Sequence, residues 1–326
     1  MKPKVILTHP MPEEWIAPLR REVDLIVGPA GVAGVDESLK PHFPEVEGLF
    51  TWLTDRVDED LLSQMPRLKV VSNLAVGVDN IDLEACTRHG VAVGHTPGVL
   101  TEAVADLTFA LLLAVARGIF SAAEDARSGR WGLWEAARWL GYELNGSTLG
   151  IFGMGKIGQA VARRGKAFGM HIIYTSRSPK PQAEAELGAR RVPWETLLEE
   201  SDFLSLHTPI TPETRGIVDA AALKRMKPTA ILINMARGAV VQTDALVEAL
   251  QKGWIAGAGL DVTDPEPLPP DHPLYKLPNC LITPHIGSAT HTTRRRMTEL
   301  AIANLLAGLR GEPLPHCANP EVYTRQ

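Results

Sequence analysis

The sequence has 326 residues, which exceeds the size at which one hydrophobic core keeps growing, so two domains are expected. Hydrophobic residues make up 45% and charged residues 22%, the composition of an ordinary soluble globular protein. The net charge of -5 gives no basic footprint for nucleic acid or for an anionic membrane, so neither is expected as a partner.

Three cysteines, Cys86, Cys280 and Cys317, lie far apart and include no CxxC pair. They predict neither a disulfide framework nor a zinc site, and they favour a reducing compartment. The apolar run at residues 5–7 is too short for a signal-peptide core, and the apolar stretch at residues 109–116 is too short to span a bilayer. We therefore expect a cytoplasmic protein that holds no metal.

Short runs rich in Val, Ile and Leu alternate with helix-like stretches, which is the pattern of a parallel sheet with crossover helices. A first series of predicted strands covers residues 4–7, 23–27, 48–52, 68–72 and 91–93, separated by helical stretches such as 58–65 and 82–88. A second series covers residues 148–152, 171–175, 203–206, 230–233, 256–260 and 280–282. The two series predict an α/β fold with two doubly wound parallel-sheet domains.

Two long helices are predicted at the joins between the domains, one over residues 101–127 with Thr101 as N-cap and one over residues 291–309. We interpret them as hinge pieces, after which the C-terminal segment returns to the first domain. The predicted domains are a discontinuous substrate-binding domain, residues 1–98 and 288–326, and a dinucleotide-binding Rossmann domain, residues 99–287. The proline-rich run at residues 264–273 predicts an irregular loop.

A glycine motif follows the predicted strand at residues 148–152. Gly153, Gly155 and Gly158 form GxGxxG, and residues 159–168 continue as a predicted helix. The first glycine permits a tight turn, the second lets the backbone approach a pyrophosphate, and the third lets the helix pack closely on the strand. Strand, turn and helix together predict a dinucleotide bound at the helix N-terminus.

Arg237, Glu266 and His285 each follow the carboxyl end of a different predicted strand, the edge where ligands bind in open α/β sheets. A guanidinium can grip a substrate carboxylate, an imidazole can donate a proton to a developing alkoxide, and a carboxylate can orient that imidazole and favour its protonated form. Taken singly, each could be a surface arginine, a solvated loop acid or a structural histidine. Together they predict the proton-transfer unit of a keto-acid reductase.

The segments 149–158, 234–238, 259–267 and 284–290 resemble the D-isomer-specific 2-hydroxyacid dehydrogenase family, and within it the glyoxylate/hydroxypyruvate reductases. The resemblance covers essentially the whole chain. It implies Arg237 for substrate binding, Glu266 as the partner of the histidine, and His285 as general acid/base. It also implies hydride transfer from NAD(P)H to C2 of a small 2-keto acid, a Rossmann domain inserted into a flavodoxin-like domain, an active site in the cleft between them, and a homodimer.

The resemblance implies further binding residues. It gives the substrate carboxylate to the backbone N–H groups of Val76 and Gly77, although an ordinary strand-to-helix turn would look similar. Independently of the resemblance, Trp52 and Leu53 lie at the loop after the predicted strand at residues 48–52 and are expected to face the substrate, where their bulk favours small keto acids over aromatic ones. The remaining implied cofactor residues, which flank the nicotinamide, the pyrophosphate and the adenosine, are Thr101, Met154, Lys156, Ile157, His207, Thr208, Pro209, Thr214, Met235, Ala236, Asp261 and Gly287.

The turn after the strand at residues 171–175 bears on the choice of cofactor. An Asp or Glu about 20 residues past the glycines binds the ribose 2′-OH of NAD. Here Ser176, Arg177 and Ser178 follow, and the nearest downstream carboxylates are at positions 184 and 186. Arg177 could pair with a 2′-phosphate and the serines could donate to it, so NADPH is expected to be preferred with NADH still usable. The alternative is an arginine that is merely solvated on a loop.

Other functions stay open at this point. Another D-2-hydroxyacid dehydrogenase, such as phosphoglycerate dehydrogenase, is possible, and so is a non-catalytic, NAD(H)-sensing corepressor built on the same fold. A formate dehydrogenase is disfavoured because that group carries glutamine where Glu266 stands. Trp131, Trp134 and Trp139 predict either a buried core or a dimer contact, and the alternative is that one reaches a neighbouring subunit's site.

Overall fold

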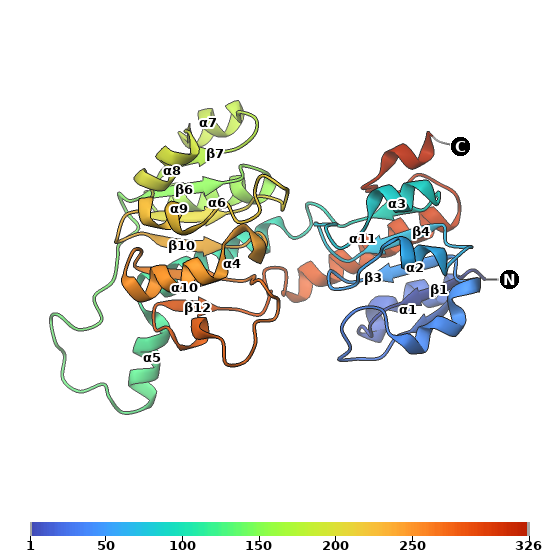
Figure 1. Cartoon of the computed structure of the whole chain (residues 1–326), viewed down its shortest axis with the longest axis horizontal. Helices are drawn as coiled ribbons and strands as arrows, with labels where there is room; N and C mark the ends of the chain where they lie inside the picture. The colour runs from blue at the N-terminus through green and yellow to red at the C-terminus, as the bar shows by residue number, and fades with distance from the viewer. Residues whose placement is uncertain (1, 325–326) are drawn as a thin grey trace. The chain divides into compact units, whose positions relative to one another are not determined.

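A computed structural model describes residues 2–324 of the chain (Figure 1). The chain folds into two compact units, Met1–Leu100 with Thr290–Gln326 (unit 1) and Thr101–Ala289 (unit 2). The chain passes from unit 1 to unit 2 after residue 100 and returns after residue 289, in each case two residues after the boundary predicted from the sequence. The C-terminal segment belongs to unit 1, as the prediction of a discontinuous domain requires.

Unit 1 contains a five-stranded, wholly parallel sheet in the order β2-β1-β3-β4-β5. This is the flavodoxin-like order. Its strands are β1 (Lys4–Leu7), β2 (Asp24–Val27), β3 (Gly48–Thr51), β4 (Val70–Asn73) and β5 (Ala92–Gly94). Its helices are α1 (Glu13–Glu22), α2 (Glu59–Ser63), α3 (Leu83–Arg88) and α11 (His291–Leu309), with the 3-10 segments η1 (Glu37–Glu45) and η4 (Pro320–Tyr323).

Alternate residues of these strands enter two separate hydrophobic clusters, because successive side chains of a strand point to opposite faces of the sheet. Ile6 and Leu49 pack with residues of α2, α3 and η1. Val5 and Phe50 pack with residues of α1 and α11. The sheet is covered on both faces, which is why its strands read as continuous apolar runs in the sequence.

Unit 2 contains a seven-stranded parallel sheet in the order β12-β11-β10-β9-β6-β7-β8. Strands β6 to β11 have the strand order of the Rossmann fold, and β12 adds a seventh strand beside β11. The strands are β6 (Thr148–Phe152), β7 (His171–Thr175), β8 (Arg190–Arg191), β9 (Phe203–Leu206), β10 (Ile231–Asn234), β11 (Gly257–Leu260) and β12 (Cys280–Ile282). The helices are α4 (Thr101–Ala116), α5 (Ile119–Arg127), α6 (Lys156–Ala167), α7 (Pro181–Leu187), α8 (Trp194–Glu200), α9 (Ala220–Arg225) and α10 (Thr243–Lys252), with η2 (Gly238–Val240) and η3 (Pro273–Lys276).

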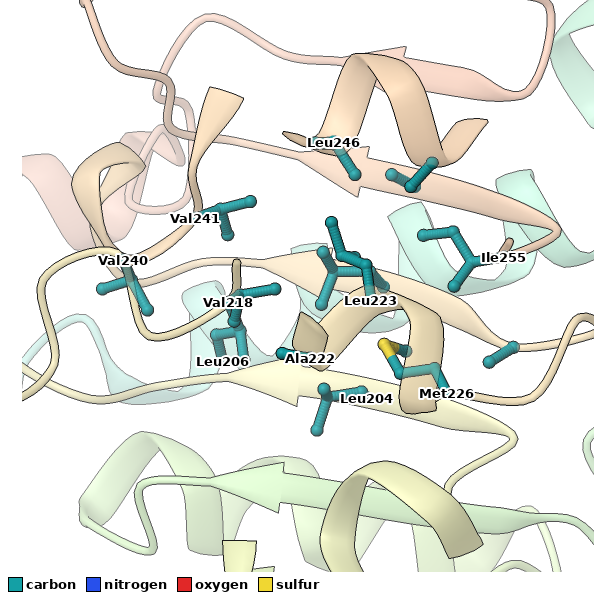
Figure 2. Packing of buried hydrophobic residues seen from close by; sticks show 14 of the residues in the cluster. Leu204, Leu206, Val218, Ala222, Leu223, Met226, Val240, Val241, Leu246 and Ile255 are labelled. Atoms are coloured by element: carbon teal, nitrogen blue, oxygen red, sulfur yellow. The ribbon is translucent and has the colours of Figure 1, made fainter. Parts of the chain in front are cut away.

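One face of the second sheet carries a large apolar cluster, part of which is drawn in Figure 2. Figure 2 shows Leu204 and Leu206 of β9 beside Leu223 of α9, with Leu246 of α10 in the same cluster. All four side chains are at most 1% exposed. The other face is covered by α4, which packs on β10, β11 and β12. The strand ends that bear Arg237, Glu266 and His285 therefore rest on a rigid, fully packed sheet.

Three local predictions differ from the structure. The single helix predicted over residues 101–127 is wrong, because Gly118 adopts a left-handed φ of 56° and α4 and α5 are bent by 64° at the break. Thr101 is the first helical residue rather than the cap. Strand β8 is absent from the prediction, because two exposed arginines carry no apolar pattern.

Two helix starts also move. Asp58 and Asp82 lie just before α2 and α3, and their side chains accept hydrogen bonds from Leu61 N and Ala85 N. They cap the helices, as aspartate at this position commonly does. Within residues 2–324 no single helix is long and apolar enough to cross a membrane, and only the bent pair of α4 and α5 reaches that length and composition.

Candidate active site in the dinucleotide-binding unit

Three adjacent strands of unit 2 end at the residues predicted to carry the chemistry. Arg237 follows β10, Glu266 lies in the loop after β11, and His285 follows β12. Since all three strands are parallel, their carboxyl ends share one edge of the sheet. Close packing joins the first two loops, because a Cβ on Gly238 would lie 1.9 Å from the backbone of Thr263.

The Arg237 turn is held by a buried amide at the end of β10. Asn234, which is 1% exposed, donates through Nδ2 to Arg237 O (3.0 Å) and accepts from Ala236 N through Oδ1 (3.1 Å). Arg237 itself donates through Nη1 to Ala236 O at 2.8 Å. The turn thus fixes the backbone from which the guanidinium extends.

Glu266 and His285 form a direct pair. His285 Nδ1 lies 2.6 Å from Glu266 Oε1, and Glu266 Oε2 accepts from Thr263 N at 3.2 Å. Burial alone would raise the pKa of Glu266, but the hydrogen bond and charge of His285, the Thr263 N–H and the charge of Arg237 together hold it below its ordinary value. An ionised Glu266 accepts from Nδ1–H and leaves Nε2 as the ring nitrogen that can face a substrate.

The backbone of His285 is in the left-handed region, with φ of 52°. Such a conformation is strained for a residue with a Cβ and persists only where neighbours enforce it. Asp261, which is 2% exposed, enforces it. Its Oδ1 accepts from Thr283 Oγ1 (2.6 Å) and Ile286 N (2.8 Å), and its Oδ2 accepts from Gly287 N (2.8 Å). Asp261, predicted above as a cofactor residue, therefore also builds the turn that presents the histidine.

Other predicted cofactor residues gather around Gly287. A Cβ there would meet Asp261 Oδ2 at 3.1 Å, Val104 at 3.3 Å and Met235 at 3.5 Å. Val104 lies one turn into α4, which Thr101 begins, and Ala236 follows Met235 at the end of β10. The structure thus brings the start of α4 and the ends of β10 and β11 to the His285 turn.

The glycine motif forms the predicted strand-turn-helix at β6 and α6. Gly153 has φ of 101°, and a Cβ there would lie 2.5 Å from His207 O. Gly155 caps α6 without any side-chain hydrogen bond, and a Cβ there would meet nothing within 4 Å. The N–H groups of the first helical turn, at Lys156 and Ile157, are therefore open to an anion. This cradle fits the pyrophosphate of a dinucleotide.

The loop after β9 contains the residues predicted to line the adenosine. His207 pairs through Nε2 with Ser205 Oγ at 2.8 Å, and burial lowers its pKa to about 3 from 6.5, so the ring is neutral. Thr208 and Pro209 follow it, and Thr214 Oγ1 donates to Pro209 O at 2.8 Å. Thr214 thus closes this loop on itself.

The turn after β7 is shaped by its own side chains. Ser176 Oγ donates to Ser178 O at 2.7 Å, so this hydroxyl is already engaged. Ser178 Oγ accepts from Lys180 Nζ at 3.1 Å. Glu184 accepts from Tyr174 OH at 2.6 Å. Among residues 2–324 no group of three His, Cys, Asp or Glu is arranged to hold a metal ion.

Comparison with known proteins identifies the family. A model described as "D-isomer specific 2-hydroxyacid dehydrogenase, NAD binding domain" matches residues 109–287. A glyoxylate reductase from Thermococcus litoralis is 52% identical, with 99% of each chain covered, and one from Pyrococcus furiosus is 49% identical, with 99% of this chain and 97% of that one covered. The chain belongs to the D-isomer specific 2-hydroxyacid dehydrogenase family.

Comparison with solved structures agrees with this assignment. A Thermus thermophilus protein is 50% identical with a TM-score of 0.91, covering 97% of this chain and 99% of that one. An NADPH-dependent glyoxylate/hydroxypyruvate reductase from Sinorhizobium meliloti, solved with NADP and malonate, is 33% identical with a TM-score of 0.86 and 98% coverage of both chains. The family resemblance stated from the sequence is confirmed. The protein is a nicotinamide-dependent oxidoreductase with two parallel-sheet domains.

Besides Arg237, which is in unit 2, the predicted substrate residues of this dehydrogenase lie in unit 1. Leu53 follows β3 and is 37% exposed, and Val76 and Gly77 follow β4 and are half-buried. Sequence reasoning did not find Asn234 and Thr283, which hold the Arg237 and His285 turns. A polar residue at the end of an apolar strand is the signal that could have pointed to Asn234.

Proposed function

We propose that this dehydrogenase reduces glyoxylate and hydroxypyruvate to their 2-hydroxy acids, with His285 as the proton donor. The observation that carries the proposal is the 2.6 Å contact between His285 Nδ1 and Glu266 Oε1, beside Arg237, at the carboxyl edge of the cofactor-binding sheet. The names of the relatives, glyoxylate reductase in Thermococcus litoralis and Pyrococcus furiosus, support the substrate class.

The residues divide the chemistry among them. When bound, the nicotinamide supplies the hydride that forms the new C–H bond at C2. Arg237 binds the substrate carboxylate and polarises the carbonyl. His285 transfers the proton from Nε2 to the carbonyl oxygen as its negative charge develops, and Glu266 keeps the imidazolium oriented and stabilised through Nδ1. The test is oxidation of NADPH and NADH with glyoxylate, hydroxypyruvate and phosphohydroxypyruvate. Absence of turnover with both glyoxylate and hydroxypyruvate would show that the proposal is wrong.

We propose further that NADPH is preferred over NADH. No carboxylate follows β7 within the turn, and Arg177 lies there with Arg191, which donates through Nη2 to Ser176 O at 2.9 Å and to Arg177 O at 3.2 Å. A second guanidinium next to Arg177 supports an anion at this turn. Nothing in the turn excludes NADH.

The ratio of kcat/KM for NADPH to that for NADH, at saturating glyoxylate, tests this preference. Arg177→Ala should lower the ratio by about tenfold or more, as expected for loss of a charge-assisted contact of ~1.5–3 kcal/mol. Arg190→Ala is the matched control, because Arg190 is an exposed arginine of the neighbouring strand that pairs with Glu200. A wild type that prefers NADH, or an unchanged ratio in Arg177→Ala, would show that the assignment is wrong.

We also propose a homodimer, formed through α5 and the segment that follows it. No residue of α5 is buried, and Figure 1 shows this helix and the long connection after it at the outer edge of unit 2. Phe120, Leu133, Trp134 and Leu140 are 65%, 86%, 84% and 78% exposed. Apolar side chains gathered in this way mark an interaction surface.

The tryptophans of this segment differ in their surroundings. The expectation of a buried core is wrong for Trp131 and Trp134, which are 66% and 84% exposed, so the dimer contact is the interpretation that we keep. Trp139 is held within the segment, since its Nε1 donates to Asp125 Oδ2 at 3.0 Å. Sedimentation of Trp134→Arg should show monomer, and Tyr275→Arg, at a 50% exposed position outside the segment, should stay dimeric. A monomeric wild type would contradict the proposal.

Since all three cysteines are unpaired, we propose that the protein is located in the cytoplasm.

A further inference from the structure

The loop after β4 has three consecutive carbonyl groups that are each held by a hydrogen-bond donor. Ala75 O accepts from Thr96 N at 2.8 Å. Val76 O accepts from His95 Nδ1 at 2.9 Å, and Gly77 O accepts from Asn73 Nδ2 at 3.1 Å. The donors come from the ends of β4 and β5, so the neighbouring strand fixes the course of this loop.

Fixing these carbonyls also fixes the N–H groups that follow them. In a planar trans peptide the C=O of one residue and the N–H of the next point in opposite directions. Thr96 therefore sets the direction of the Val76 N–H, and His95 sets that of the Gly77 N–H. Within residues 2–324, neither N–H has a hydrogen-bond acceptor, and both residues are half-buried. Two neighbouring, unpartnered N–H groups form a site suited to an anion.

We propose that His95 is a positioning residue for the substrate carboxylate: its Nδ1–H holds the Val76–Gly77 peptide so that the Gly77 N–H is presented to the anion. The inference rests on the proposed reduction of 2-keto acids. Since a carbonyl oxygen can only accept, Nδ1 carries the proton in both the neutral and the charged ring.

The C-terminal helix of unit 1 anchors His95 in turn. Asn304 of α11, fully buried, donates through Nδ2 to His95 O (2.9 Å) and accepts from His316 N through Oδ1 (2.9 Å). His95 N donates to His316 O at 3.2 Å. Gly94 allows this approach, because a Cβ there would lie 2.6 Å from Asn304 Cβ. Because both the N–H and the C=O of His95 are held, the backbone of this residue is fixed, and its ring is placed to donate to Val76 O.

The carboxylate is present in both the substrate and the transition state. A residue that positions its binding groups therefore changes KM with little change in kcat, whereas general loss of active-site structure would lower kcat as well. Oxalate, which carries carboxylates and is not reduced, reports the same site without turnover. These two readouts separate positioning from a merely structural role.

The test compares His95→Ala and His95→Asn with wild type. Asparagine bears its Nδ2–H on Cγ, as histidine bears Nδ1, so it can replace the donor. His89→Ala is the matched control, because His89 also holds a partner through its ring, Glu59 at 2.6 Å, and is not bonded to the loop. The measurements are kcat and KM for glyoxylate, and the Kd values of NADPH and of oxalate by calorimetry with saturating NADPH.

In His95→Ala, KM for glyoxylate and Kd for oxalate should rise about tenfold, the effect of ~1.4 kcal/mol. We expect kcat within about twofold of wild type, an unchanged Kd for NADPH, and recovery to within about threefold in His95→Asn. Should the alanine variant melt below the assay temperature, His95→Leu, which keeps bulk and lacks the donor, replaces it. An unchanged oxalate Kd without the donor, or no recovery in His95→Asn, would overturn the proposal. If wild type does not reduce glyoxylate, the proposed function fails, and oxalate binding still decides the role of His95.

Discussion

Asp261→Asn is the substitution whose effect follows most directly from the geometry of the His285 turn. The carboxylate accepts three hydrogen bonds, two at Oδ1 from Thr283 Oγ1 and Ile286 N and one at Oδ2 from Gly287 N. An amide has one oxygen and one N–H₂ group at the same two places. In either rotamer of asparagine, one of the two backbone N–H groups must face the amide N–H₂ and lose its acceptor.

The magnitude follows from that loss. A hydrogen bond to a charged group contributes ~1.5–3 kcal/mol, and a buried donor left without an acceptor costs ~1–3 kcal/mol, so we expect unit 2 to lose about 3 kcal/mol of its free energy of unfolding. At roughly 2–4 °C per kcal/mol for a domain of this size, its melting temperature should fall by about 6–12 °C. Because the turn holds His285 at φ of 52°, kcat should fall as well, by about tenfold to a hundredfold.

Differential scanning calorimetry and steady-state kinetics measure these two effects. Asp202→Asn is the matched control, because Asp202 also accepts a backbone hydrogen bond, from Thr148 N at 2.8 Å, but precedes β9 at the opposite edge of the sheet. The amide oxygen of asparagine can keep the contact with Thr148 N, and the partly exposed ion pair of Asp202 with Lys227 (2.7 Å) that is lost contributes only ~0–1 kcal/mol, so we expect less than about 1 kcal/mol of destabilisation and an unchanged kcat. A wild-type melting temperature and kcat in Asp261→Asn would refute the reasoning.

The remaining predictions concern the three residues at the strand ends. His285→Ala should reduce turnover by about a hundredfold or more while the Kd for NADPH measured by fluorescence stays unchanged, and near-normal reduction would remove His285 as proton donor. Arg237→Lys should lower kcat/KM for glyoxylate at least about tenfold, ~1.4 kcal/mol, because a lysine cannot make the planar bidentate contact; a smaller loss would place Arg237 away from the substrate. Glu266→Gln tests the charge on a group whose pKa lies below its ordinary value. Reduction needs a protonated imidazole, so removing this charge should move the high-pH decline of kcat/KM to lower pH, and an unshifted profile would contradict the pairing.

Much of unit 2 could be predicted from the sequence because its local signals agree with one another. The strand at Thr148–Phe152, the three glycines and the following helix combine an apolar run, a turn and an amphipathic segment at adjacent positions. Arg237, Glu266 and His285 were found because parallel strands place their carboxyl ends at one edge. Helix 101–127 was predicted wrongly, since one glycine within an apolar run is compatible with either a continuous helix or a break.

The contacts that aim the functional groups were decided only by the tertiary structure. Asp261 could be named from a motif, yet its hydrogen bonds to Ile286 N and Gly287 N depend on β11 and β12 lying side by side. His95 could be seen in the sequence, but its contact with Val76 O depends on β4 pairing with β5 and on α11 returning from the far end of the chain to hold it. Periodicity and turn chemistry are local properties and can be read along the chain, whereas the orientation of a side chain or peptide is set by partners that the fold brings from distant positions.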